Sequence, residues 1–122
     1  MHPIPKDTSV AISRVERGNG HVRILLGRTV YPGPVPRTYR ADEINQFNME
    51  DPCYPEEMSD TGRALVDHFI YHGNTGVTEV NFVSPRVVEI SHDPILYPVH
   101  DLENDVRTLV RYVDRFGYAE LR

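Results

Sequence analysis

The sequence predicts an α+β fold: a two-layer sandwich with ββαββα order, in which two helices pack on a mostly antiparallel four-stranded sheet. Two hairpin patterns and two helix patterns lead to this prediction, because each expected pair of strands is followed by an expected helix. A chain of 122 residues fits one domain. We therefore treat residues 1–122 as a single domain with a proline-rich, acidic loop at about 31–58.

The first hairpin is expected within Ser9–Val30, a segment in which apolar side chains alternate with other residues. Val22, Ile24 and Leu26 share one face of the second strand in this pattern. Between the strands, Gly18-Asn19-Gly20 supplies residues that tolerate positive φ, which a short hairpin turn requires.

The segment 31–58 is expected to be a long connection without long helices or strands. "YPGPVPR" carries three prolines, and "NMEDPCYPEEM" places two more among acidic residues. Proline removes a backbone donor and disfavours helix at the residue before it. Within this segment, "ADEINQF" can form one helical turn. A connection of this length is unusual in a compact domain, which makes it a candidate for a functional or a mobile segment.

A helix is predicted from an N-cap at Ser59 or Asp60 to about His72, where "GNTG" ends it. Asp67 and His68 are expected to point away from its buried face. That face is expected to hold Leu65, Phe69 and His72, with Val66 and Ile70 beside them.

The C-terminal part of the sequence predicts a second hairpin and a second helix. "VTEVNFV" and "VVEI" read as strands joined by a turn at Ser84-Pro85-Arg86, with Val88 and Ile90 on the buried face. The helix is expected to begin near Asp101, as a cap, and to end at Gly117. Its apolar residues recur at three- and four-residue steps: Leu102, Val106, Leu109, Val110, Val113 and Phe116.

Charge and composition exclude several classes of protein. The chain has 13 basic and 18 acidic side chains and a net charge of −5, which disfavours nucleic acid as the main partner. No apolar run approaches the roughly 20 residues that span a bilayer. The N-terminal sequence lacks the apolar stretch of a secretory signal, and the single cysteine excludes an internal disulfide. We expect a cytoplasmic protein that does not enter a membrane.

Four histidines are candidate metal ligands. His68 and His72 are four residues apart, a spacing that can place both on one side of a helix, and His92, Asp93 or His100 could complete a site. The zinc-protease pattern needs a glutamate directly after the first histidine, and Phe69 stands there. The simpler interpretation is that these histidines are surface groups, and we predict no bound metal.

The sequence contains no recognisable catalytic set. Cys53 lies among acidic residues, which raise the pKa of a thiol and so disfavour a nucleophilic role. No Gly-x-Ser-x-Gly or phosphate-binding glycine pattern occurs, and the paired carboxylates of the loop read as solvated surface. We therefore predict a protein that is not an enzyme and needs no cofactor.

Aromatic residues in the long loop are the candidate interaction residues. Tyr31, Tyr39, Phe47 and Tyr54 occur there among prolines and charged residues. Aromatic side chains are common anchors of protein interfaces. They can equally hold the loop onto the sheet, and the sequence favours neither alternative.

The two hairpin regions resemble the N-terminal domain of Nfu/NifU-like iron–sulfur scaffold proteins. "VAISRVERGNGHVRILLGRTV" is similar to the opening hairpin of that domain, and "SDTGRALVDHFIYHGNTGVTEVNFVSPRVVEISHD" to its helix and closing hairpin. The resemblance covers about Ser9–Arg37 and Ser59–Val113. Two departures are an insertion at Ala41–Met58 and the absence of the tryptophan that the family often places before its last helix. The matching positions are Ala64, Leu65, Gly76, Val77 and Val80.

The resemblance implies an accessory or docking domain. In full-length members of the family, a separate domain with a Cys-x-x-Cys motif holds the cluster, and four thiolates are the usual ligands of a four-iron cluster. This chain has one cysteine, so two copies cannot supply four thiolates. We expect a protein partner in iron–sulfur assembly or delivery. The alternatives are a small histidine-dependent metal protein or enzyme, and a subunit of an oligomer with a site between subunits.

Overall fold

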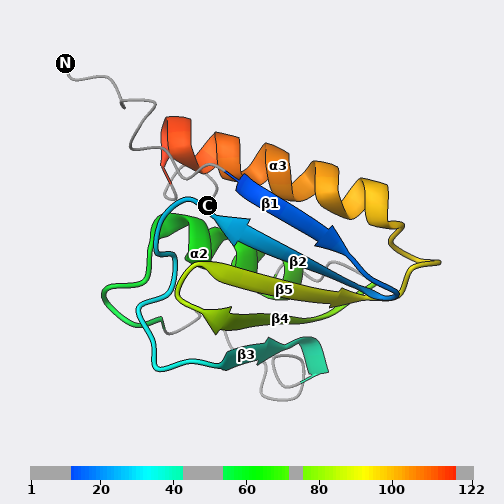
Figure 1. The fold of residues 1–122 in the computed structure, drawn as a ribbon, viewed down its shortest axis with the longest axis horizontal. Helices are drawn as coiled ribbons and strands as arrows, with labels where there is room; N and C mark the ends of the chain where they lie inside the picture. The colour runs from blue at the N-terminus through cyan, green and yellow to red at the C-terminus, as the bar shows by residue number, and fades with distance from the viewer. Residues whose placement is uncertain (1–11, 43–53, 72–75, 118–122) are drawn as a thin grey trace.

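A computed structural model describes residues 12–42, 54–71 and 76–117 of the chain. They form an α+β fold in which one antiparallel sheet, in the strand order β1-β2-β5-β4-β3, carries the helices on one face (Figure 1). The elements are β1 (Ile12–Arg17), β2 (His21–Leu26), β3 (Arg37–Arg40), α2 (Asp60–Val66), the π-helix η2 (Asp67–Tyr71), β4 (Val77–Ser84), β5 (Val87–His92) and α3 (Val99–Phe116).

Both predicted hairpins are present. β1 pairs with β2 and β4 with β5, and β2 also pairs with β5, so the two hairpins join into one sheet. Gly20 has a φ of 85° in the first turn, a conformation that glycine adopts without steric cost. Val88 and Ile90 are buried as expected, and Val22, Ile24 and Leu26 are buried opposite them on β2. The alternation of apolar residues therefore identified the buried face of these strands correctly.

The prediction of four strands is wrong, because the sheet has five. β3 lies in the loop that was expected to lack long regular elements, and it pairs antiparallel with β4, with Tyr39 opposite Val80. Only one side chain of this short strand, Tyr39, is buried. A single apolar residue gives no alternation to recognise, and the strand is formed because β4 offers it an unpaired edge.

The middle helix begins where the sequence predicts. Ser59 is the N-cap, and its Oγ accepts a hydrogen bond of 3.1 Å from the backbone N–H of Gly62. After Val66 the chain continues as the π-helix η2. The expectation that Asp67 points away from the core is wrong: it is buried, and the Tyr54 hydroxyl donates a 2.5 Å hydrogen bond to its Oδ1. His72 lies outside the described residues.

The last helix starts earlier than predicted. Pro98 is the residue before its first turn, and Asp101 lies within that turn instead of capping it. Proline has a fixed φ and no backbone donor, so it fits the start of a helix. The helix ends at Gly117, as expected, with a φ of 86°. Phe116 is 54% exposed and is not part of the buried face.

The core lies between the sheet and the helices. Alternate residues of β2, β4 and β5 meet apolar side chains of α2, η2 and α3, and the largest fully buried side chains are Phe69 and Phe82. Within the described residues, no helix is long and apolar enough to cross a membrane.

Candidate interaction surface

One face of the sheet has no helix packed on it within the described residues. Its side chains alternate along each strand with the buried ones: Leu25 lies opposite Val87 on neighbouring strands, and Arg23 lies opposite Glu89. These residues are half-buried or exposed, whereas Ile24 between Arg23 and Leu25 is fully buried. The sheet therefore has one face in the core and one open face, a common arrangement for antiparallel sheets.

A hollow of about 430 Å³ lies on the open face. Three aliphatic side chains from three strands, Leu25, Val83 and Val87, contribute to it and are half-buried. Charged side chains from β1 and β2 surround them. The lining residues are Arg14, Glu16, Arg23, Leu25, Val83, Ser84 and Val87.

The charges of the open face are paired with one another. Arg14 lies 2.9 Å from Glu16 along β1, and Arg23 lies 3.1 Å from Glu89 across two strands. All four side chains are partly or largely exposed to solvent, so such pairs contribute about 0–1 kcal/mol to stability. They are weakly held and can exchange partners when another surface approaches. An aliphatic hollow among exchangeable charges resembles the mixed composition of protein interfaces.

The aromatic residues of the loop lie mostly in the core. Tyr31 and Tyr39 are 3% and 5% exposed. The Tyr31 ring stacks on Phe82 with 5.0 Å between centroids, and the Tyr39 ring meets Tyr54 edge-on at 5.9 Å. These rings hold the segment onto the sheet, the second of the two alternatives. Phe47 lies outside the described residues. A role of these residues as anchors for a partner stays a prediction.

The hydroxyl of Tyr39 has no hydrogen-bond partner among the described residues, although it is buried. The Arg37 guanidinium carbon lies 4.3 Å above the centre of the Tyr39 ring, over its face. Burial raises the pKa of Tyr39 above its usual 10.0, and the positive charge of Arg37, together with a weak hydrogen-bonding approach of its side chain that falls short of normal hydrogen-bond geometry, offsets part of this effect. A buried hydroxyl without a normal hydrogen bond costs stability.

The candidate metal ligands that lie within the described residues do not converge. His92 is buried, with Nδ1 2.7 Å from the carbonyl oxygen of Tyr97, so the expectation of a surface histidine is wrong there. His68 packs edge-on against Phe69, and His100 is exposed. The part of the chain that the structure describes contains no group of three or more His, Cys, Asp or Glu side chains that could hold a metal. His72 and Cys53 lie outside it.

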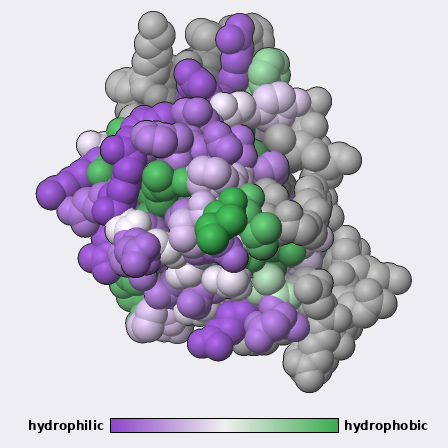
Figure 2. Space-filling view, turned by 90° about the vertical axis from the view of Figure 1, so that its right-hand side faces the viewer, coloured by the Kyte–Doolittle hydropathy of each residue, from purple (hydrophilic) through white to green (hydrophobic). Residues whose placement is uncertain are grey.

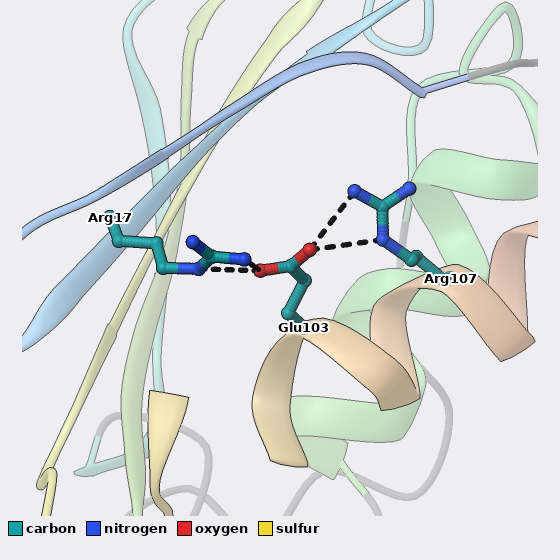
Figure 3. Close-up of polar contacts among 3 residues, drawn as sticks. All are labelled: Arg17, Glu103 and Arg107. Carbon is teal, nitrogen blue, oxygen red and sulfur yellow. Dashed lines mark hydrogen bonds and ion pairs between the residues drawn. The ribbon is translucent and has the colours of Figure 1, made fainter. Parts of the chain in front are cut away.

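An ion-pair network between sheet and helix was not anticipated from the sequence. Glu103 on α3 is nearly buried and accepts hydrogen bonds from Arg17 of β1 at 2.7 Å and from Arg107 at 3.0 Å (Figure 3). Burial by itself raises the pKa of Glu103, but the hydrogen bonds and charges of the two arginines outweigh it and lower the pKa below its usual value. The four-residue spacing of Glu103 and Arg107 was the available signal.

A second exposed apolar feature lies in the loop before α3. Ile95 and Leu96 are 87% and 67% exposed, and their backbone N–H groups are near the Asp93 carboxylate, which accepts from Ile95 at 2.9 Å. Figure 2 views the molecule from the end that carries this loop and shows a small hydrophobic patch on a mainly hydrophilic surface.

No protein-family model, curated protein or solved structure matches this chain. The comparisons therefore do not link it to the Nfu family, and the resemblance in its hairpins stays a sequence-based expectation.

Proposed function

We propose that this chain is a non-catalytic protein-interaction domain that docks a partner on the open face of its sheet. The observation that carries the proposal is the hollow on that face, where Leu25, Val83 and Val87 lie half-buried among exchangeable charges. Fully burying an aliphatic side chain contributes about 1.5–3 kcal/mol relative to exposure. The three aliphatic side chains of the hollow are already partly covered, so burying the rest of their surface supplies a smaller share of a binding free energy.

The proposal extends to the kind of partner through the sequence resemblance alone. The hairpins resemble an accessory domain of iron–sulfur scaffold proteins, so an assembly or delivery factor is the partner class that we propose to test first. With a single cysteine, the chain would contribute a docking surface to such a complex, while its partners hold the cluster.

The test is quantitative capture of partners from the native cell extract by three purified chains. Val87→Asp adds a charge inside the hollow, and Asn104→Asp adds the same charge at an exposed position of α3, in the other layer of the fold. Thermal melting of each chain establishes that both variants are folded.

We expect a partner that the wild type and the Asn104→Asp chain retain and the Val87→Asp chain loses. Iron–sulfur assembly proteins among the partners lost in this way would support the proposed class. Capture that is equal for all three chains would refute docking in the hollow. Metal analysis of the same purified protein tests the alternative based on the histidines.

A further inference from the structure

The exposed side of α3 carries a basic stripe next to two aromatic rings. Arg107, Arg111 and Arg115 follow one another at four-residue steps, which places them along one side of the helix. Tyr112 and Phe116, also four residues apart, are 36% and 54% exposed, with 4.8 Å between their ring centroids. We use the term basic–aromatic stripe for these five residues.

The arginines of this stripe are only partly neutralised. Arg107 is held by Glu103, whereas Arg111 and Arg115 form no ion pair among the described residues. Arg115 instead lies over the Phe116 ring, 5.6 Å from its centre. Arg115 lies in the last turn of α3, where the helix dipole favours a cation. The dipole does not account for a pair of exposed aromatic rings beside the arginines.

Arginine and large aromatic residues are the types most enriched at the centres of protein interfaces. The stripe therefore has the composition of a docking site, and its charge requires an acidic counterpart. This chain contains one: the segment before α2 exposes Glu56 and Glu57, and Asp60 is exposed at the start of α2. This acidic turn (Glu56, Glu57 and Asp60) and the C-terminal end of α3 lie at the same end of the molecule (Figure 1).

We propose that a second copy of this chain occupies the stripe, with the acidic turn of each copy on the basic–aromatic stripe of the other. Two complementary patches at one end of the molecule suit a two-fold dimer, because the axis between the copies brings each patch onto its counterpart twice. The exposed aromatic rings supply the apolar contact, and the charges set the register. This interface is separate from the open face of the sheet.

The test is sedimentation velocity of the purified chain over a concentration series, with two charge-reversed variants. In the first, Arg111→Glu and Arg115→Glu give a helix and a turn that are both acidic. In the second, Glu56→Arg and Glu57→Arg give a helix and a turn that are both basic. We expect each variant alone to be monomeric under conditions in which the wild type dimerises, with at least a tenfold weaker association.

Mixing the two variants in equal amounts is the decisive step. Each acidic surface of the first then faces a basic surface of the second, so we expect a mixed dimer of about wild-type stability. As a control, Arg14→Glu with Arg23→Glu makes the same change in net charge on the open sheet face and should leave the dimer intact. Phe116→Ser, which keeps every charge, should weaken the dimer.

The proposal would be overturned by a wild type that stays monomeric throughout the series, by dimers that persist in both charge-reversed variants, or by variants that do not associate when mixed. Loss of the dimer only in the control variant would assign dimerisation to the open face of the sheet, and would also refute the proposal.

Discussion

Replacing Tyr39 by phenylalanine should stabilise the protein. The substitution removes a buried hydroxyl that has no hydrogen-bond partner and keeps the ring that packs against Tyr54 and Phe82. It also keeps the Arg37 guanidinium over the ring face. An unsatisfied buried polar group costs about 1–3 kcal/mol, and its removal without a cavity returns part of that cost.

We expect Tyr39→Phe to raise the free energy of unfolding by about 1 kcal/mol, which corresponds to about 3–5 °C in the melting temperature of a domain of this size. Chemical denaturation and calorimetry measure the two quantities independently. Tyr31→Phe is the matched control, because the Tyr31 hydroxyl is not one of the buried atoms without a partner. It should change stability by much less.

Tyr39→Phe should also change how the stability of the protein depends on alkaline pH. The pKa of Tyr39 is raised in the folded state, so the folded protein holds this proton more tightly than the unfolded chain does. The stability that comes from this tighter proton binding is present below pH 10.0 and is lost as the pH rises through the folded-state pKa. The advantage of Tyr39→Phe over the wild type should therefore widen above 10.0. A destabilised variant, or an advantage that narrows with rising pH, would show that the hydroxyl has a partner and refute the reasoning.

Substitutions at three further positions test other parts of the fold. Glu103→Gln should cost about 1–2 kcal/mol at neutral pH, because the two arginines lose their carboxylate but remain partly solvated. Since the pKa of Glu103 is lowered in the folded state, its contribution to stability is present above pH 4.5 and is lost as the pH falls through the folded-state pKa. The free energies of unfolding of the two proteins should therefore converge at acid pH. Gly62→Ala should cost about 1–3 kcal/mol in denaturant unfolding, because the added Cβ would lie 2.6 Å from the carbonyl oxygen of Val30. Ser59→Ala should cost about 1 kcal/mol and Ser59→Asp much less, since aspartate also caps.

Local patterns predicted most of this fold. The glycine-rich turn and the alternation around Ile24, Val88 and Ile90 identified both hairpins, and the N-cap at Ser59 located the middle helix. These features depend on residues close together in the sequence, whose spacing directly reflects backbone geometry. The rest depends on contacts between distant segments. β3 exists because Arg37–Arg40 meets the free edge of β4, and a four-residue strand with one buried side chain has no periodic signal.

The candidate site was less accessible to sequence reasoning for the same reason. Asp67 was placed outward by helical spacing, but it is buried and its carboxylate accepts a hydrogen bond from the hydroxyl of Tyr54, 13 residues away. Leu25 and Val87 are unremarkable in the sequence, since their position on the open face follows from the pairing of β2 with β5. The aromatic residues were noticed, but a sequence cannot show whether a ring points into a core or out of it.

The bridge from Arg17 through Glu103 to Arg107 has a consequence for how the folded protein opens. An edge strand held by one neighbouring strand alone would fray independently. Its amide protons would then exchange with solvent faster than those of the helices packed against the sheet. Here the end of β1 is also attached to α3, so detaching this strand removes one of the two arginine partners of a nearly buried carboxylate. Deuterium uptake in the last residues of β1 should therefore follow that of the first turns of α3, as one cooperative unit.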